Sequence, residues 1–408
     1  MTKIEIKDLY LIFGKEKQRA YRQLKEGKSK SEILKTTGCT IAVQDANLTI
    51  NEGEIFVVMG LSGSGKSTLL RCINRLIKPT HGEILINGVD ISSATDKELL
   101  RVRREELAMV FQNFGLLPHR TVLSNIGFGL ELQGVDKDKR KEKSLESMKL
   151  VGLEGYEEQM VSELSGGMQQ RVGLARALAN NPEVLLMDEA FSALDPLIRV
   201  QMQDELLALQ QKMKKTIVFI THDLNEAIKL GDRIAIMRDG EIVQVGTSEE
   251  ILTEPANDYV KDFVESVDRS KVISANSIML ENPILGRFPK EGPAVIIRKM
   301  RSKNLTRLPV IDNSGVLIGE VRLKDMVKLR RDNVRSIESA IRTDNLSVTP
   351  DTVIEDLLPL MTKTNSPICV VDDNNKVLGL IPLHWLVIEM TGKEKTEIEE
   401  IIQNSQES

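Results

Sequence analysis

The sequence predicts an α/β fold in two parts, a larger domain around a mostly parallel sheet and a smaller module with an internal repeat. Residues 1–240 alternate short β-branched runs with longer helical stretches, which is typical of parallel sheets with crossover helices. A glycine-rich loop, residues 60–68, separates an apolar run from a segment that favours a helix. Residues 307–319 and 366–379 resemble each other, which indicates a repeat. A length of 408 residues fits two or three domains.

The glycine-rich loop fits the pattern G-x-x-x-x-G-K-[ST] of a phosphate-binding loop. Its glycines let backbone amides approach a phosphate closely, and the N-terminus of the following helix adds partial positive charge. We therefore predict that Lys66 reaches the β- and γ-phosphates of a nucleoside triphosphate and that the Ser67 hydroxyl binds Mg²⁺. The loop residues expected to bind the nucleotide are Gly60, Ser62, Gly63, Ser64, Gly65, Lys66, Ser67 and Thr68.

Two further motifs follow the loop in chain order. Residues 164–171, with the sequence LSGGMQQR, begin an apolar helix, and the apolar run 184–187 ends in Asp188 and Glu189. With the loop, they resemble the Walker A, signature and Walker B motifs of the ATP-binding subunits of ABC transporters, and Met168 is the departure from the common signature. This resemblance implies a P-loop ATPase domain with a mostly parallel sheet and a helical subdomain. The Q-loop glutamine, D-loop aspartate and switch histidine of that family are matched by Gln112, Asp195 and His222.

The resemblance also implies a role for each polar residue. Glu189 would polarise the attacking water as the general base, and His222 would hold Glu189 and that water in position. Mg²⁺ keeps several waters in its octahedral shell, so it needs few protein ligands. The candidate catalytic residues are Lys66, Gln112, Glu189 and His222, and the candidate metal ligands are Ser67, Gln112 and, through a water, Asp188.

The chain carries one glycine loop and one signature. In the family, signature residues matching Ser165, Gly166 and Gly167 begin a helix that completes the ATP site of the opposite subunit. Asp195 of the D-loop is also expected to contribute to nucleotide binding. We therefore expect a head-to-tail homodimer that holds two ATP molecules.

The adenine of ATP needs a stacking surface, which an aromatic side chain provides. Members of the family place an aromatic residue near the end of the first strand. Phe13 fits that place, and Tyr10 is the alternative. Either residue could instead belong to the core of an N-terminal strand.

Composition excludes several classes of function. A net charge of −5 and an aromatic content of 3% argue against a nucleic-acid partner. No apolar run reaches the roughly 18 residues of a membrane span, and the first residues lack the features of a signal peptide. The scattered cysteines, Cys39, Cys72 and Cys369, indicate reduced thiols in a cytosolic protein. We expect any membrane role to come through a partner.

An unusual insert spans residues 15–38, and it is basic and helix-prone with a thin apolar stripe. One interpretation is a solvated helix pair at the periphery. The insert also resembles one in the ATPase subunits of glycine betaine and proline betaine importers, which most ABC ATPases lack. This implies a subunit that powers import of quaternary amine osmoprotectants from the cytoplasmic face of the cell membrane. Its partners would be permease subunits, docked at residues 112–120, and a substrate-binding domain or protein.

Alternatives to this assignment stay open at the level of sequence. Proline, choline or carnitine could replace glycine betaine as the substrate. A non-transport ABC ATPase and an exporter ATPase are the rival classes. The first usually shows a long coiled coil, zinc-binding cysteines or two fused nucleotide domains, which this sequence lacks.

The C-terminal third predicts a second architecture. Residues 241–269 are interpreted as a helical linker, and residues 270–332 and 333–392 as two repeats of strand, Asp/Asn turn, strand and helix. The repeats resemble a tandem of CBS domains, each a βαββα unit, with final helices expected at 324–329 and 383–390. Residues 393–408 are predicted to form an acidic tail.

Three hypotheses compete for the role of this module. Its role could be limited to dimerisation, it could bind a regulatory adenine nucleotide or cyclic dinucleotide, or it could respond to ionic strength through charged surfaces. In CBS repeats an aspartate near the final helix often holds a ribose. Asp325 fits that position in the first repeat, but Trp385 occupies the matching position in the second.

Overall fold

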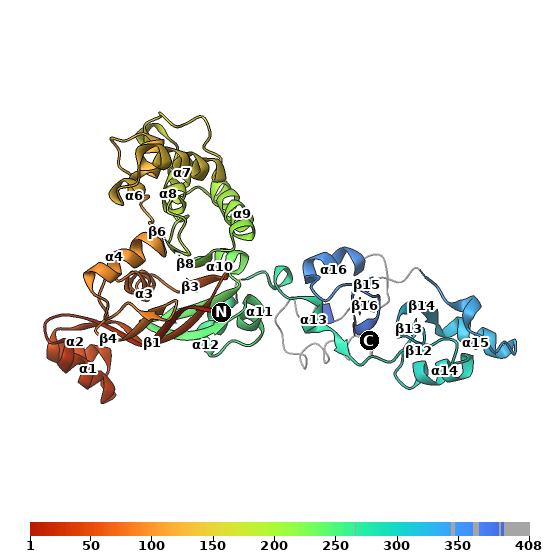
Figure 1. Cartoon of the computed structure of the whole chain (residues 1–408). Coiled ribbons are helices and arrows are strands. Elements are labelled where there is room, and N and C mark those ends of the chain that lie inside the picture. The colour runs from red at the N-terminus through yellow and green to blue at the C-terminus, as the bar shows by residue number, and fades with distance from the viewer. Residues whose placement is uncertain (266, 344–346, 362–366, 383–384, 387–408) are drawn as a thin grey trace. The chain divides into compact units, whose positions relative to one another are not determined.

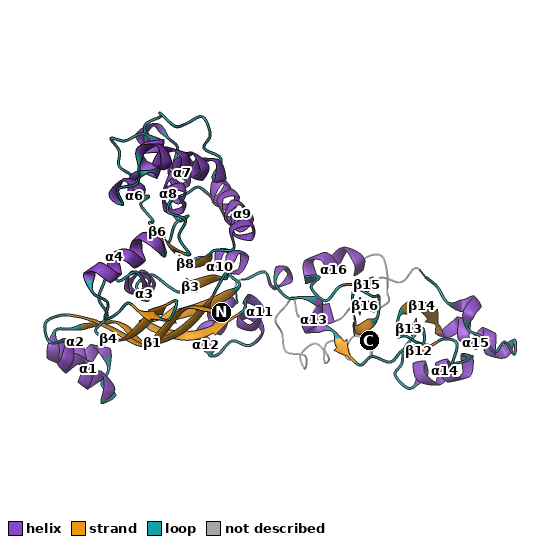
Figure 2. Cartoon of the chain, in the orientation of Figure 1, coloured by secondary structure: helices purple, strands orange, loops and turns teal. Residues whose placement is uncertain are grey.

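The computed structural model describes residues 1–265, 267–343, 347–361, 367–382 and 385–386 (Figure 1). They form two compact units, Met1–Val267 and Asp268–Ser408. Each unit mixes helices with strands, so the predicted α/β class is confirmed (Figure 2). No helix in the described part of the chain is both long and apolar enough to span a bilayer.

A six-stranded sheet in the order β10-β9-β3-β8-β7-β6 lies at the centre of the N-terminal unit. All neighbouring strands pair in parallel except β10, which runs antiparallel to β9. Strands β3, β7 and β8 are buried along their whole length, which explains their continuous apolar runs. The strands are β3 (Ile55–Met59), β6 (Leu107–Val110), β7 (Val184–Asp188), β8 (Thr216–Thr221), β9 (Arg233–Arg238) and β10 (Glu241–Gly246).

A second, antiparallel sheet has the order β2-β1-β4-β5 and was not anticipated from the sequence. It shares one apolar core with the central sheet, because side chains such as Ile4 and Ile50 join Val58 and Ile220 in a single cluster. Helix α3 (Lys66–Ile73), which follows the glycine loop, adds Leu69 to this core. The strands are β1 (Thr2–Phe13), β2 (Thr40–Asn51), β4 (His81–Ile86) and β5 (Val89–Asp90).

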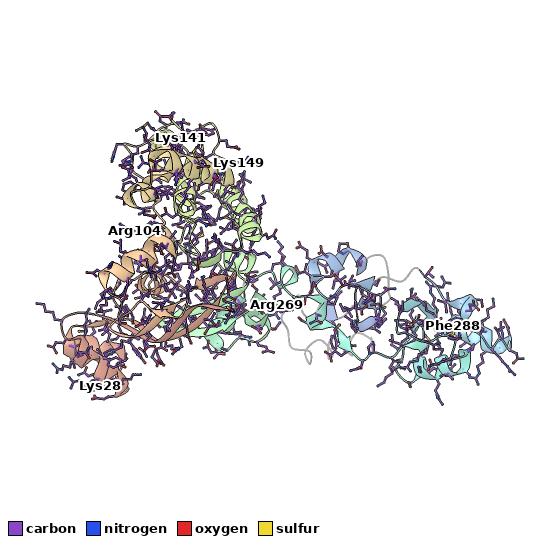
Figure 3. All side chains as sticks on the ribbon, viewed as in Figure 1. Lys28, Arg104, Lys141, Lys149, Arg269 and Phe288 are labelled. Carbon is purple, nitrogen blue, oxygen red and sulfur yellow. The ribbon has the colours of Figure 1, made fainter. Side chains whose placement is uncertain are left out.

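The insert between β1 and β2 forms two helices, α1 (Lys17–Lys25) and α2 (Lys30–Thr37). It is not merely a solvated pair, because Ala20 and Ile33 are fully buried against Ile12 and Cys39 at the ends of the two strands. Figure 1 shows both helices at one end of the antiparallel sheet, and Figure 3 labels Lys28 in the loop between them.

A group of helices lies apart from the sheets, in the upper part of Figure 1, and forms the predicted helical subdomain. Ile126 and Met148 are fully buried there, and Leu174 is nearly so. The helices of residues 96–230 are α4 (Asp96–Glu105), α5 (Val122–Ile126), α6 (Phe128–Leu132), α7 (Lys137–Leu150), α8 (Gly166–Leu178), α9 (Pro196–Met213) and α10 (Leu224–Leu230), with the short 3₁₀ turn η1 (Val161–Glu163).

The predicted helical linker, residues 241–269, is wrong in its first part. Residues Glu241–Gly246 form β10, which returns along β9 from the turn at Asp239 and Gly240. Both turn residues have positive φ, 49° and 82°, as a tight Asp-Gly hairpin requires. That dipeptide was the overlooked signal for a strand. Two helices follow, α11 (Ser248–Thr253) and α12 (Asp258–Val264), and belong to the N-terminal unit.

The described residues of the C-terminal unit form two small sheets, ordered β12-β13-β14 and β11-β17-β16-β15. The predicted helix at 324–329 is present as part of α15. The first repeat contains β12 (Gly286–Arg287), α14 (Pro293–Arg301), β13 (Arg307–Ile311), β14 (Leu317–Arg322), α15 (Leu323–Arg331) and η3 (Glu338–Ala340). The second contains β15 (Ser347–Val348), α16 (Ile354–Met361), β16 (Ile368–Val371) and β17 (Val377–Ile381), preceded far upstream by η2 (Arg269–Lys271), α13 (Ala275–Ile278) and β11 (Leu280–Glu281).

The repeats exchange their first segments, which the predicted boundaries 270–332 and 333–392 did not anticipate. Strand β11 pairs with β17, and Ile273 and Ile278 are buried in the core of the second repeat. Conversely, Ile337 is buried in the core of the first repeat, and the backbone of Arg342 forms an isolated antiparallel β-bridge with Glu320 of β14. Apart from residues 385–386, the expected helix at 383–390 lies outside the described residues, as does the acidic tail, 393–408.

Candidate active site

The glycine loop connects β3 to α3, as predicted. All three of its glycines have positive φ: 150° at Gly60, 83° at Gly63 and 102° at Gly65. A Cβ atom would lie 2.2 Å from the Met237 carbonyl oxygen at Gly60 and 2.7 Å from the Ala42 carbonyl oxygen at Gly65. Only glycine therefore allows the loop to pack this closely against β9 and β2.

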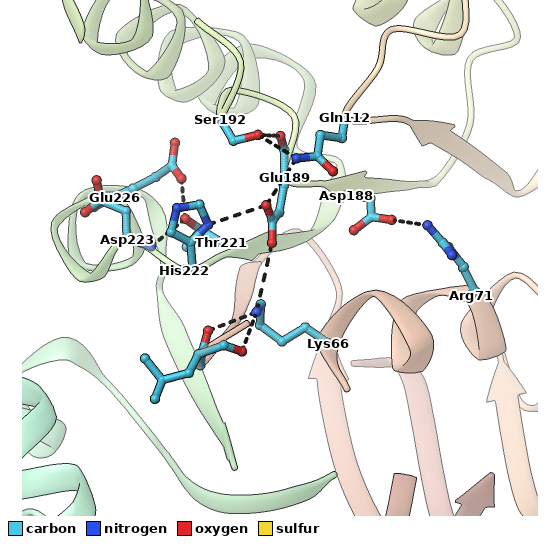
Figure 4. A network of polar contacts seen from close by, with 12 residues as sticks. Lys66, Arg71, Gln112, Asp188, Glu189, Ser192, Thr221, His222, Asp223 and Glu226 are labelled. Carbon is cyan, nitrogen blue, oxygen red and sulfur yellow. Dashed lines mark hydrogen bonds and ion pairs between the residues drawn. The ribbon is translucent and has the colours of Figure 1, made fainter. Parts of the chain in front are cut away.

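Lys66 begins α3 and is held over this loop. Its Nζ donates to the carbonyl oxygens of Gly60, at 2.9 Å, and Leu61, at 3.1 Å, and lies 4.0 Å from Oε1 of Glu189 (Figure 4). The side chain is 4% exposed, and burial lowers its pKa. A phosphate entering here would meet a cation that is poorly hydrated, which strengthens the attraction.

Glu189 stands directly after β7 and is where the predicted catalytic residues meet. Its Oε2 lies 3.4 Å from Nδ1 of His222 and accepts from Nε2 of Gln112 at 3.4 Å. Gln112 also donates to Ser192 Oγ, which in turn donates to the Glu189 carbonyl oxygen. The structure thus brings together Lys66, Gln112, Glu189 and His222 from four separate segments (Figure 4).

Asp188, the last residue of β7, is 6% exposed in its side chain, and its Oδ2 lies 3.4 Å from a terminal guanidinium nitrogen of Arg71. Sequence reasoning missed this partner on α3. The predicted metal ligands Ser67, Gln112 and Asp188 offer a hydroxyl, an amide and a carboxylate, the oxygen donors that Mg²⁺ prefers. In the described part of the chain no three His, Cys, Asp or Glu residues cluster as a metal site would need. The donor set fits a metal whose other ligands are substrate phosphates and water.

A cavity of about 420 Å³ opens over the loop. Phe13 lines it and is 43% exposed, whereas Tyr10 is 3% exposed. Tyr10 donates to Asp45 at 2.8 Å and accepts from Lys25 at 2.7 Å, so it is a core residue and Phe13 is the aromatic at the cavity. The other lining residues are Lys30, Thr40, Ile41, Ala42, Ser62, Gly63, Gly65, Lys66, Ser67, Thr68, Glu189, Asp239 and Gly240.

Some predicted ligands lie elsewhere. Ser64 is buried, and it does not line the cavity. Ser165 caps α8 by accepting from the amide of Met168, and Asp195 caps α9 by accepting from that of Ile198. Neither residue lines the cavity of its own chain, and the same holds for Gly166 and Gly167.

A buried network beside His222 was missed from the sequence. Glu226 on α10 accepts from Thr221 Oγ1 at 2.5 Å and from Gln203 Nε2, on α9, at 3.1 Å. Burial raises the pKa of Glu226. The spacing Asp223-x-x-Glu226 suggests a helix cap, and Asp223 does cap α10, but Glu226 points inward instead.

Of the cavities away from this centre, two are lined by residues near the predicted docking loop and in the first CBS repeat. One, of about 360 Å³ in the N-terminal unit, is lined among others by Phe111, Gly115, Phe128 and Arg176. Arg176 donates to the carbonyl oxygens of Phe114 and Gly115, which fixes the loop after Gln112. The second, of about 620 Å³ in the C-terminal unit, is lined by Thr306, Arg307, Arg322, Leu323, Lys324 and Val327.

Comparison with known proteins agrees with this geometry. Residues 43–192 match the family model of the ABC transporter, and residues 289–332 and 334–384 match that of the CBS domain. The glycine betaine/carnitine transport ATP-binding protein GbuA of Listeria monocytogenes is 52% identical over 97% of this chain and 99% of its own length. The glycine betaine/proline betaine transport system ATP-binding protein ProV of Salmonella typhimurium is 50% identical over 94% of this chain and 96% of its own.

Solved structures extend the comparison to assembly. A dimeric structure of the bacterial ABC transporter cassette MJ0796 is 35% identical, with a TM-score of 0.50, over 60% of this chain and 98% of that one. A dimer of the same cassette in a post-hydrolysis state bound to ADP and phosphate is 34% identical, with a TM-score of 0.51 and the same shares. The chain therefore belongs to the family of ABC transporter ATP-binding proteins that carry C-terminal CBS domains, and it is an ATPase of that family.

Proposed function

We propose that this ATPase powers the import of glycine betaine and related quaternary amines across the cytoplasmic membrane. The ATPase assignment rests on one observation: polar side-chain atoms of Lys66, Gln112 and His222 all lie within 4.0 Å of the Glu189 carboxylate. The substrate class is supported by relatives near 50% identity that are named for glycine betaine transport. Carnitine is the second candidate, because the Listeria relative is also named for it.

In the proposed reaction, Lys66 leaves the loop carbonyls and Glu189 to bind the β- and γ-phosphates of ATP. Glu189, released from this contact, polarises the attacking water, and the 3.4 Å contact with His222 keeps its carboxylate aimed. Ser67, Gln112 and Asp188 would hold Mg²⁺, which supplies positive charge to the phosphate oxygens. Phe13 would stack on the adenine.

The proposed working form is a head-to-tail homodimer. Ser165, Gly166, Gly167 and Asp195 would then bind the nucleotide held by the partner chain, as the resemblance to the family implies, and none of them lines the cavity of its own chain. The dimeric cassettes that resemble this chain support the assignment.

We infer that permease subunits dock at the cavity beside residues 112–120, which places the chain at the cytoplasmic face of the membrane. The apolar side chains of Phe111 and Phe128 line that cavity, and the loop leads directly from Gln112 at the ATP site. A Phe114→Asp or Leu116→Asp chain should keep basal ATPase and lose transport. Transport at the wild-type rate in both variants would reject this docking site.

The C-terminal unit is proposed to bind a regulatory adenine nucleotide or cyclic dinucleotide. Arg307, Arg322 and Lys324 line its cavity and suit phosphate. Asp325, the expected ribose ligand, does not line this cavity, and its Oδ2 lies 3.8 Å from Nε of Arg342. Pure dimerisation and a response to ionic strength are the rival roles. Calorimetry with AMP and a cyclic dinucleotide on a full-length Lys66→Ala chain tests this: no heat of binding would reject the nucleotide role.

The transport proposal is tested by uptake of labelled glycine betaine, carnitine, choline and proline in cells that express this chain with its permease. A Glu189→Gln chain is the control, and external osmolarity is varied. Betaine uptake that requires Glu189 and rises with osmolarity supports the proposal. Intact ATPase without uptake of any quaternary amine would reject the substrate class.

A further inference from the structure

One wall of the nucleotide cavity comes from the insert, which none of the ATPase motifs includes. Lys30, the first residue of α2, lines the cavity together with Phe13, Thr40 and Ile41. Phe13 ends β1 and Thr40 begins β2, so this wall is made by the insert and by the two strand ends that it joins.

The position of Lys30 is fixed by the helix that carries it. Ser29 and Glu32 form a capping box at the start of α2, and Ile33 is fully buried one turn later. Thr36 donates to Gln23 at 2.8 Å, which ties α2 to α1. The insert therefore holds Lys30 at the cavity as a packed element would, and not as a mobile loop.

The ammonium of Lys30 is already engaged at the cavity edge. Its Nζ donates to the carbonyl oxygen of Asp239, in the hairpin turn that also lines the cavity, and lies 3.9 Å from Oε1 of Glu241. The side chain is 32% exposed, and burial lowers its pKa. The turn is tied to the glycine loop, because the amide of Gly240 donates to the Ser64 carbonyl oxygen at 2.9 Å.

We propose that Lys30 is a nucleotide-binding residue and donates a hydrogen bond to the base–ribose part of ATP. The inference rests on the proposed ATP site, in which Lys66 and the loop bind the phosphates and Phe13 stacks on the base. Lys30 shares its wall with Phe13, and an ammonium carries three donors. It can therefore keep the Asp239 carbonyl and still donate to a ribose oxygen or a base nitrogen. The insert is then part of the ATP site.

Nucleotide affinity gives the first test. ATP and ADP binding to the full chain is compared for wild type, Lys30→Met and the matched control Lys35→Met, which removes a charge from an exposed position on the same helix. We expect Lys30→Met to raise both dissociation constants by a similar factor, roughly fivefold, because a charge-assisted hydrogen bond outside the γ-phosphate is lost. Lys35→Met should bind as wild type does, and Lys30→Arg should recover most of the affinity. Unchanged affinity in Lys30→Met overturns the inference.

Chemical labelling gives a second, direct test. The ribose of periodate-oxidised ATP carries two aldehydes, and a lysine amine within reach condenses with one of them to an imine, with loss of water. Borohydride reduces this imine to a stable amine, which mass spectrometry locates. We expect the label on Lys30, with protection by excess ATP. Protectable label that spares Lys30 overturns the inference.

Failure of this inference is distinguishable from failure of the ATP site itself. A Lys66→Ala chain that binds ATP as tightly as wild type would overturn both. When Lys66→Ala abolishes binding and Lys30→Met leaves it unchanged, only the role of Lys30 is lost. The thermal unfolding midpoint of the free chain checks for indirect damage: a Lys30→Met chain that unfolds at the wild-type temperature but binds ATP weakly supports direct contact.

Discussion

The two compact units differ in what their buried side chains contact. In the N-terminal unit, Lys66 at the start of α3 and Asp188 at the end of β7 are each 4% exposed as whole residues, and Lys66 lines the nucleotide cavity. In the described part of the C-terminal unit, the joint between the repeats is apolar: Leu317 packs with Cys369 and Val371. Charged groups are expensive to bury unless they are paired. The second unit pairs its buried Glu320 with Arg307 at 2.8 Å, whereas Lys66 of the first unit lies 4.0 Å from Glu189 in a site that serves chemistry. Substitutions in the two units should therefore have separable effects.

The largest effect is expected from Glu189→Gln, which keeps the size of the side chain and removes the base. ATPase activity should fall by about 100-fold or more, the contribution typical of a general base. ATP binding should persist, because Lys66 and the loop are unaltered. Phosphate release and nucleotide affinity measure the two quantities. Full activity in this chain would remove Glu189 from the mechanism.

The corresponding test in the C-terminal unit is Leu317→Ala, at the joint between the repeats. Loss of a buried leucine should lower the free energy of unfolding of that unit by about 2–5 kcal/mol and leave basal ATPase unchanged. Trp385 is the single tryptophan of the chain and belongs to this unit, so its fluorescence during denaturation reports that unit alone.

Leu378→Ala provides the control for this measurement, since Leu378 is 40% exposed on β17. It should cost little stability. If Leu317→Ala and Leu378→Ala proved equally mild, the apolar joint would not stabilise the pair of repeats.

A smaller effect is expected at Phe13, the side chain proposed to stack on the adenine. Phe13→Ala should raise the dissociation constant of ATP by about tenfold, within the range measured for base–aromatic stacking. Tyr10→Phe should leave that constant unchanged, but it removes the hydroxyl that contacts Asp45 and Lys25 and should lower the free energy of unfolding by about 1–3 kcal/mol. Equal ATP affinity in Phe13→Ala and wild type would contradict the stacking role.

The smallest effect concerns pH and Glu226. Burial raises the pKa of this carboxyl above its ordinary value of 4.5, so the folded state binds more protons than the unfolded state from pH 4.5 up to the raised value. The free energy of unfolding should therefore fall as pH rises through that window. Glu226→Gln removes this titrating carboxyl, so the free energy of unfolding of the wild type should fall with rising pH relative to that of the variant. Parallel curves of unfolding free energy against pH would contradict it.

Local pattern was sufficient to predict the catalytic centre and insufficient for its surroundings. Apolar runs that end in Asp188 and Glu189 or lead to His222 must be buried parallel strands, and their ends meet at one edge of the sheet. Phe13 and Tyr10 could not be told apart, because β1 has several irregularities of register that break its two-residue alternation. Glu226 was missed because its partners, Thr221 and Gln203, come from different elements.

The exchange of segments between the repeats could not be read from the sequence, because Ile273 and Ile278 would suit either apolar core. Its consequence concerns how the module can be divided. A chain ended after residue 332 would keep β11 and these isoleucines but lose β17 and the core that covers them. It would also lose Ile337 from the repeat that it was meant to isolate. Each repeat can be recognised by itself in the sequence, whereas its apolar core is complete only when both repeats are present. Residues 268–281 follow the ATPase unit directly in the chain and pack in the second repeat. The chain therefore enters the module through the repeat whose other strands come last in the sequence.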